Sequence, residues 1–371
     1  MKANPIGLYL HLPFCLKKCN YCDFCSFAGL SASVREEYIS ALVREISSYK
    51  RDERISVDTV FFGGGTPSLL TPTELARIFS AIGGSFDILP DAEITLEANP
   101  KTFTPEKIRD YAALGVNRLS IGLQSIHENE LKKLGRIHNL DDFKSAYDMT
   151  LSAGIQNINV DLMYGIPDQS LKSLSETLSF ITSISPTHLS AYGLIVEEGT
   201  PFFEARDSLL LPSDDEEYMM YREVCSALRG AGYRHYEISN YAKPGYESRH
   251  NLKYWQNREY IGVGISAYSY YGDSRYGNTH DLTEYLSCDY ARHRTVDPVD
   301  FEVRAFEYAM LGLRRDVGID TSEYERLAGR MLSKEKIKGY VDLGYMRRSG
   351  DRISLTEDGF YVSNTILAEL L

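Results

Sequence analysis

Three cysteines near the start of the chain are the residues best placed to do chemistry. Cys15, Cys19 and Cys22 are separated by three and then two residues, so one short loop carries all three thiols. Three thiolates can hold three irons of a four-iron cluster and leave the fourth iron open to another ligand. Because an open iron can bind a further molecule, the spacing predicts a reactive [4Fe–4S] cluster.

A structural zinc ion is the alternative occupant of this loop. Zinc sites usually use four ligands, often arranged as two separated pairs. Cys25 could supply a fourth thiol, but four cysteines on one short loop are an unusual zinc arrangement. We therefore interpret Cys25 as a neighbouring thiol and not as a cluster ligand. Cys225 and Cys288 stand alone in the sequence and receive no role.

The elements that must position the loop follow a regular alternation through the first half of the chain. Short β-rich runs alternate with amphipathic helical patterns, which is typical of parallel βαβ units. The predicted strands are 7–11, 58–62, 93–97, 118–122, 155–162 and 188–193, and the predicted helices are 34–49, 73–82, 105–114, 140–153 and 171–184. The expected fold is α/β, a partial (β/α)6 barrel.

The unusual loops all follow predicted strands. The cysteine loop follows the first strand, and the run from Gly63 to Pro67 follows the second. The dipeptides beginning at Asn99 and Gln124 and the tripeptide beginning at Gly165 follow the next three. In parallel barrels the working residues lie at the C-terminal ends of the strands. These loops therefore predict a single active site at one end of the barrel.

The second half of the chain divides into two further parts. Residues 1–231 form the predicted barrel, ending in a helix that begins after Ser213. Residues 232–300 are an extension rich in tyrosine and glycine. Residues 301–371 combine helical patterns with a hairpin near 344–355 and a helix from about Thr356, which resembles a winged-helix module.

Bulk composition limits the partners and the compartment. The chain has 371 residues, of which 43% are apolar and 25% charged, as in ordinary globular proteins. Its net charge of −12 disfavours nucleic acid and anionic membranes as main partners. No apolar run reaches about 18 residues, so we expect no transmembrane segment. No secretion signal is evident, and six cysteines are too few for a disulfide scaffold, so we expect a reduced, cytoplasmic protein.

The block from Tyr9 to Phe24, with the pattern Y-x-H-x-P-F-C-x3-C-x-Y-C-D-F, resembles the signature of radical S-adenosylmethionine (SAM) enzymes. More narrowly, it resembles the branch of oxygen-independent coproporphyrinogen III dehydrogenase and its HemW-type heme chaperone relatives. The resemblance covers nearly the whole chain. It implies that the three cysteines bind a [4Fe–4S] cluster and that SAM chelates the open iron. One-electron reduction would then yield methionine and a 5′-deoxyadenosyl radical.

The resemblance also implies a set of SAM contacts. Glycines allow backbone to approach a ligand closely, and the arginine fork suits a carboxylate. Each polar residue taken alone is equally consistent with a hydrogen bond inside the barrel. The implied SAM residues are Tyr9, Tyr21, Gly64, Gly65, Thr66, Glu97, Gln124, Arg136, Asp161 and Ile195.

A second motif, H-N-x-x-Y-W, carries the only tryptophan of the chain. It comprises His250, Asn251, Tyr254 and Trp255. Histidine can ligate heme iron and aromatic rings can line a porphyrin, although a histidine among aromatics is more often structural. The motif resembles the one that marks the heme-chaperone branch, where it is implicated in heme binding, so these four residues are the heme candidates and His250 the candidate ligand.

Two functions compete. The dehydrogenase type has a fourth cysteine two residues after the third and a long extension before the cysteine block. Here that position is Phe24, and fourteen residues precede Cys15. With the H-N-x-x-Y-W motif, these features favour a heme chaperone that binds heme, a [4Fe–4S] cluster and SAM and delivers heme to apoproteins. An electron donor is an expected partner, and dehydrogenase activity is not expected. A radical enzyme acting on another substrate remains a third alternative.

Overall fold

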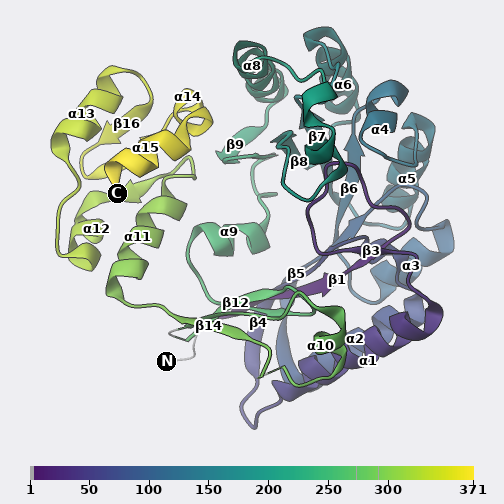
Figure 1. Ribbon diagram of the computed structural model, residues 1–371. Coiled ribbons are helices and arrows are strands. Elements are labelled where there is room, and N and C mark those ends of the chain that lie inside the picture. The colour runs from purple at the N-terminus through teal and green to yellow at the C-terminus, as the bar shows by residue number, and fades with distance from the viewer. Residues whose placement is uncertain (1–3, 273, 291) are drawn as a thin grey trace.

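A single twelve-stranded sheet organises the computed structural model, which describes residues 4–272, 274–290 and 292–371 (Figure 1). All six predicted strands are present as consecutive parallel neighbours in the predicted order. They are β1 (Ile6–Leu12), β4 (Ile55–Gly64), β5 (Phe86–Ala98), β6 (Arg118–Gln124), β7 (Asn157–Tyr164) and β8 (His188–Gly193). The sheet has free edge strands at both ends of its order, so the barrel is partial, as expected.

Residues 232–300 add strands to both edges of this sheet. On the β1 side, β11 (Tyr260–Val263) runs parallel to β1 and is followed by antiparallel β12 (Tyr268–Tyr271), β13 (Ser274–Gly277) and β14 (Thr295–Pro298). On the β8 side lie antiparallel β10 (Asn240–Ala242) and β9 (Arg234–Glu237). The predicted extension is therefore part of the main sheet, and our proposed domain boundary at 231/232 stays a prediction.

Helices pack on the outer face of the parallel strands (Figure 1). They are α1 (Ala32–Ser48), α2 (Pro72–Ser85), α3 (Pro105–Ala113), α4 (Glu128–Lys133), α5 (Leu140–Ser152), α6 (Leu171–Ile184) and α8 (Asp214–Gly230). Capping boxes at Thr71, Asn139, Ser170 and Ser213 start four of them by pairing backbone N–H groups that a helix leaves free. Along β1, Leu8 and Leu10 are fully buried in this core, while Tyr9 belongs to the opposite, inner face.

Shorter elements frame the strand ends. Strands β2 (Phe14–Cys15) and β3 (Phe27–Ala28) pair with each other around the cysteine loop. The others are the 3-10 helices η1 (Pro67–Leu69) and η2 (Arg206–Ser208) and the helices α7 (Pro201–Glu204), α9 (Arg249–Trp255) and α10 (Leu282–Leu286).

The C-terminal part has its own apolar core. It comprises α11 (Phe301–Gly312), β15 (Ile319–Asp320), α12 (Thr321–Ala328), α13 (Lys334–Asp342), β16 (Met346–Ser349), β17 (Arg352–Leu355), α14 (Glu357–Tyr361) and α15 (Ser363–Leu370). The predicted hairpin is present as β16 and β17. The terminal helix is split in two after the Thr356 cap. Assignment of this part as a winged helix stays a prediction.

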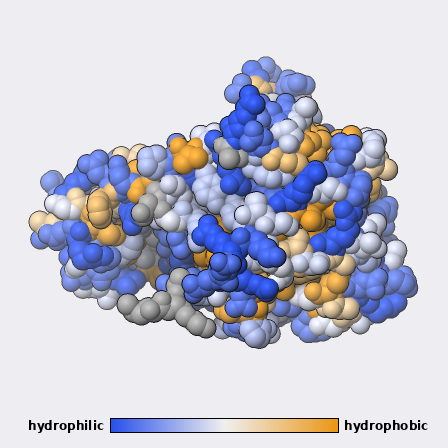
Figure 2. Space-filling model, turned by 90° about the horizontal axis from the view of Figure 1, so that it is seen from below, coloured by the Kyte–Doolittle hydropathy of each residue, from blue (hydrophilic) through white to orange (hydrophobic). Residues whose placement is uncertain are grey.

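Hydrophilic side chains cover much of the molecular face seen from below, with smaller apolar areas between them (Figure 2). None of the helices in the described residues combines the length and apolar character that a membrane crossing requires.

Candidate cofactor site

The cysteine loop is fastened at its base by His11. The ring Nε2 of His11 donates to the carbonyl oxygen of Cys25 at 2.7 Å, and the Tyr9 hydroxyl donates to Nδ1 at 3.0 Å. The amide of Phe27 closes the loop by donating to the Pro13 carbonyl at 2.7 Å. The sequence motif therefore builds a rigid base under the cysteines.

All three predicted cluster ligands are free thiols at partly exposed positions. The Sγ of Cys15 lies 3.7 Å from the Thr66 hydroxyl, and the Sγ of Cys19 accepts a hydrogen bond from Arg136 at 3.7 Å. Burial, together with the nearby Cys19 and Cys15, raises the pKa of Cys22 to about 11. Because iron binds the thiolate, a bound cluster would release these protons. The residues present thus fit a cluster.

The glycines at the end of β4 allow two chain segments to touch. Gly64 has a φ of 111°, and a Cβ there would lie 2.7 Å from Cε1 of His11. A Cβ on Gly65 would lie 2.6 Å from the Phe14 carbonyl oxygen. Both glycines are therefore required for the close packing of β4 against the cysteine loop, whatever ligand is bound.

Two predicted site residues, Glu97 and Asp161, are buried carboxylic acids on the inner face of the sheet, close enough for the charge of Asp161 to affect Glu97. Burial, followed by the charge of Asp161, raises the pKa of Glu97 to about 8, although the amide of Gly64 donates to its Oε2 at 3.1 Å. Burial also raises the pKa of Asp161, against hydrogen bonds from Asn159, Ser190 and Ser120. Paired acceptors of this kind suit ligand hydroxyl or amino groups.

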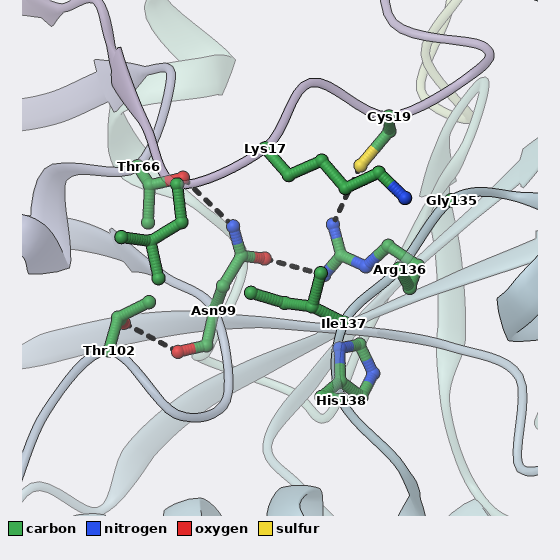
Figure 3. A pocket seen from close by; sticks show the side chains of 10 residues that line it. Lys17, Cys19, Thr66, Asn99, Thr102, Gly135, Arg136, Ile137 and His138 are labelled. Atoms are coloured by element: carbon green, nitrogen blue, oxygen red, sulfur yellow. Dashed lines mark hydrogen bonds between the residues drawn. The ribbon is translucent and has the colours of Figure 1, made fainter. Parts of the chain in front are cut away.

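Arg136 joins the cysteine loop to the strand ends (Figure 3). Its guanidinium donates to Oδ1 of Asn99 at 2.5 Å and to the Gly122 carbonyl at 2.8 Å, besides Cys19. Asn99 in turn donates to the Thr66 hydroxyl at 3.0 Å. The Nε of Arg136 is buried without a partner in the described protein, so the group retains an unused donor for a ligand acceptor.

Asn99 lies in one of the predicted strand-end loops, but the sequence analysis gave its side chain no role. It follows β5 directly and lines the pocket together with Thr102 and His138, beside Arg136 (Figure 3). Its position immediately after a parallel strand was the available signal, since that is where such sites collect polar residues.

The remaining predicted SAM residues differ in placement. Gln124 ends β6 in the left-handed region at φ 68°, a conformation that costs free energy in a residue other than glycine. Tyr21 lies near enough to Arg136 and Asp161 for their charges to affect its pKa, which burial raises. Ile195 follows β8 and is 68% exposed, so it lies at the rim and not inside.

Comparisons with known proteins identify the family of this site. A model described as "Radical SAM superfamily" matches residues 9–181. The heme chaperone HemW of Bacillus subtilis is 34% identical over 98% of both chains. The heme chaperone HemW of Escherichia coli is 35% identical over 99% of this chain and 98% of its own. The chain belongs to the HemW family of the radical SAM superfamily.

A solved structure shares the fold along the whole length. Coproporphyrinogen III oxidase (HemN) from Escherichia coli, described as a radical SAM enzyme, superimposes with a TM-score of 0.86 over 99% of this chain and 90% of that chain. Its identity to this chain is 21%, so the match establishes the fold. The expected α/β fold of radical SAM type is thereby confirmed.

The H-N-x-x-Y-W motif forms α9, which packs on the inner face of the sheet below the site. The amides of Arg249 and His250 donate to the two carboxylate oxygens of Glu93 at 3.1 and 3.0 Å. The His250 ring stacks on Phe61 with 5.2 Å between centroids and lies 6.5 Å from the ring of Tyr9. The motif of this HemW family member therefore occupies the same interior as the predicted SAM residues.

His250 does not present a free ring nitrogen. Its Nδ1 pairs with the Thr59 hydroxyl at 2.9 Å and its Nε2 with the Tyr254 hydroxyl at 2.8 Å. The residue is 1% exposed, and burial lowers its pKa to about 3. An axial heme ligand needs a nitrogen lone pair directed at iron. Iron ligation by His250 would require one of these hydrogen bonds to break, and its role as heme ligand stays a prediction.

The other motif residues are less enclosed. Asn251, Tyr254 and Trp255 are partly exposed. The Trp255 side chain hydrogen-bonds to the buried Glu237, whose pKa burial raises to about 7.

Proposed function

We propose that this protein is a heme chaperone that binds a [4Fe–4S] cluster, SAM and heme and delivers heme to apoproteins. The observation that carries the proposal is the similarity of the whole chain, at 34% and 35% identity, to proteins named heme chaperone HemW. We further propose that it acts in the cytoplasm, receives electrons from a donor protein and does not use nucleic acid as a partner, in line with its net charge of −12.

We propose that Cys15, Cys19 and Cys22 hold the cluster. When bound, cluster and SAM together supply a one-electron cleavage that generates an organic radical. Around them, Glu97 and Asp161 would accept hydrogen bonds from ligand hydroxyl groups, and Arg136 would offer its unused donor. The proposed SAM contacts remain Tyr9, Tyr21, Gly64, Gly65, Thr66, Glu97, Gln124, Arg136, Asp161 and Ile195.

Heme contact at α9 is proposed for the partly exposed side chains of Asn251, Tyr254 and Trp255. No ligation step is assigned to His250, since both ring nitrogens already have partners.

Oxidative decarboxylation of coproporphyrinogen III is the second candidate function, and the shared fold with HemN favours it. Phe24, which stands where the dehydrogenase type has its fourth cysteine, is 61% exposed and contributes no thiol.

The test of the two functions supplies anaerobically reconstituted protein with SAM, reductant and either coproporphyrinogen III or heme. We expect stoichiometric heme binding and unchanged coproporphyrinogen. Formation of protoporphyrinogen IX would overturn the chaperone proposal.

The ligand count of the cluster has a separate test. Replacing Cys15, Cys19 or Cys22 by Ala should abolish the thiolate–iron absorption at about 400 nm in reconstituted protein. Cys25→Ala is the matched control on the same loop and should keep that absorption. Its loss in Cys25→Ala would contradict our ligand assignment.

A further inference from the structure

A second group of metal-binding side chains lies far from the cysteine loop in sequence. Among the described residues, one group of three His, Cys, Asp or Glu side chains has ligand atoms within 4.8 Å of one another: Cys225, His235 and Glu357. Cys225 lies on α8, His235 on β9, and Glu357 is the first residue of α14. The group therefore spans the junction between the sheet and the C-terminal part.

The spacing of the sulfur and nitrogen atoms suits a shared ion. The Sγ of Cys225 lies 4.0 Å from Nδ1 of His235. With bonds of about 2.3 Å to sulfur and about 2.0 Å to nitrogen, two ligands of a tetrahedral zinc lie about 3.5 Å apart. The Sγ–Nδ1 distance of 4.0 Å is long for a direct hydrogen bond, and it is within about half an ångström of the ligand–ligand distance in a tetrahedral zinc site.

His235 is held with one nitrogen facing the thiol. Its Nε2 donates to the Ile238 carbonyl at 3.2 Å, which leaves Nδ1 as the acceptor. Its ring stacks on Tyr241 at 4.1 Å between centroids, so the orientation is fixed. Histidines that bind metals usually donate their second ring nitrogen to a carbonyl or carboxylate in this way.

The remaining two groups provide matching charge. Cys225 is fully buried and its Sγ lies 3.2 Å from the Tyr241 hydroxyl. Glu357 is paired with Arg229 at 2.7 Å and keeps further acceptor capacity. A thiolate and a carboxylate lower the cost of placing a divalent cation in this buried junction, where the carboxylate also balances the charge of Arg229.

We propose that Cys225, His235 and Glu357 bind a zinc ion that fastens the C-terminal part to α8 and β9. A mixed sulfur, nitrogen and oxygen ligand set is one that zinc accepts readily, with water or a tyrosine hydroxyl in the fourth position. The ion would reinforce contacts that already cross this junction, namely the Arg229–Glu357 pair and the hydrogen bond from the Tyr221 hydroxyl to the Glu357 carbonyl at 2.7 Å.

The first test counts zinc in the full chain with its cysteine loop occupied by a reconstituted cluster. After dialysis against a weak chelator, we expect one zinc per chain. Cys225→Ser should remove it, while Cys288→Ser, the matched control outside the cysteine loop, should retain it. Equal zinc content in the parent protein and Cys225→Ser would overturn the proposal, as would the absence of bound zinc in the parent protein.

A second variant distinguishes loss of the zinc ligand from misfolding, because Cys225→Ser changes a buried residue. Glu357 is at the surface end of the group, so Glu357→Gln should keep the fold and weaken zinc binding by at least about tenfold. Co²⁺ is the spectroscopic probe, in the full-length protein carrying Cys15→Ala, Cys19→Ala and Cys22→Ala. A thiolate-to-cobalt charge-transfer band that is lost in Cys225→Ser supports the site. A band that persists in Cys225→Ser contradicts it.

Discussion

At the scale of single residues, the site is defined by groups whose ordinary ionisation is suppressed. Glu97 is held near Asp161 on the inner face, and His250 is neutral between two hydroxyls. The resemblance to radical SAM enzymes named these groups as site residues, whereas their residue types alone were equally consistent with hydrogen bonds inside the barrel. The partners of His250 were not predictable, because Thr59 and Tyr254 reach it only after strands distant in sequence have paired.

The raised pKa of Glu97 makes stability depend on pH. Folded protein keeps the proton up to about pH 8, whereas an unfolded glutamate loses it near pH 4.5. The folded state therefore binds more protons in this window, and its stability falls as pH rises through it, by at most about 1.4 kcal/mol per pH unit. Glu97→Gln should remove this slope. Urea unfolding of the cluster-free protein between about pH 5 and 8 measures it, and parallel curves for both proteins would contradict the assignment.

Replacement of His250 by Phe tests its structural role. The new ring can keep the stacking on Phe61, but the buried hydroxyl of Thr59 and the partly buried hydroxyl of Tyr254 lose their partner. We expect the free energy of unfolding to fall by about 1–3 kcal/mol, measured by urea titration. Thr59→Val in the same background should recover part of the loss. Unchanged stability in His250→Phe would show that neither hydrogen bond matters.

At the scale of elements, the local sequence patterns predicted the strands of the parallel core but not the strands added at the edges of the sheet. Helix α6 and strand β8 have the predicted limits, whereas β5 begins at Phe86, seven residues before its predicted start. Pro90 lies at a register shift in the β4–β5 pairing, where residues 89–92 have no partner in β4, and β6 pairs with β5 only from Thr95 onward. Proline is tolerated there because its missing N–H interrupts no ladder hydrogen bond. Strands β11 to β14 have four residues each; only β11 pairs with β1, and each later strand pairs with the one before it, so their short sequences carry little signal.

Glu45 on α1 fastens these edge strands to the core. It is 0% exposed and accepts hydrogen bonds from the Gly264 amide, Tyr285 and Arg294 at 2.8, 2.8 and 2.7 Å. Glu45→Ala should cost about 3–5 kcal/mol of unfolding free energy, since it leaves buried donors unpaired. Glu36→Ala on the same helix, which breaks the exposed pair with Arg77, should cost less than about 1 kcal/mol. Equal losses in the two variants, measured by thermal or urea unfolding, would contradict this account.

At the scale of the whole molecule, one interior serves both motifs. The cysteine loop and strand ends lie above α9, which packs on the inner face of the same sheet, and the C-terminal part adjoins α8. The Tyr9 side chain lies between the two motifs: its hydroxyl donates to His11 at the base of the cysteine loop, and its ring lies 6.5 Å from the ring of His250.

Heme transfer is the measurement that tests the central claim most directly. Reconstituted protein is loaded anaerobically with one equivalent of heme, freed of excess by gel filtration, and mixed with a heme-free acceptor protein whose absorption changes on heme binding. The account predicts that heme stays with the protein through gel filtration and then appears in the acceptor. Failure to retain heme, or retention without any transfer together with turnover of coproporphyrinogen III, would contradict it.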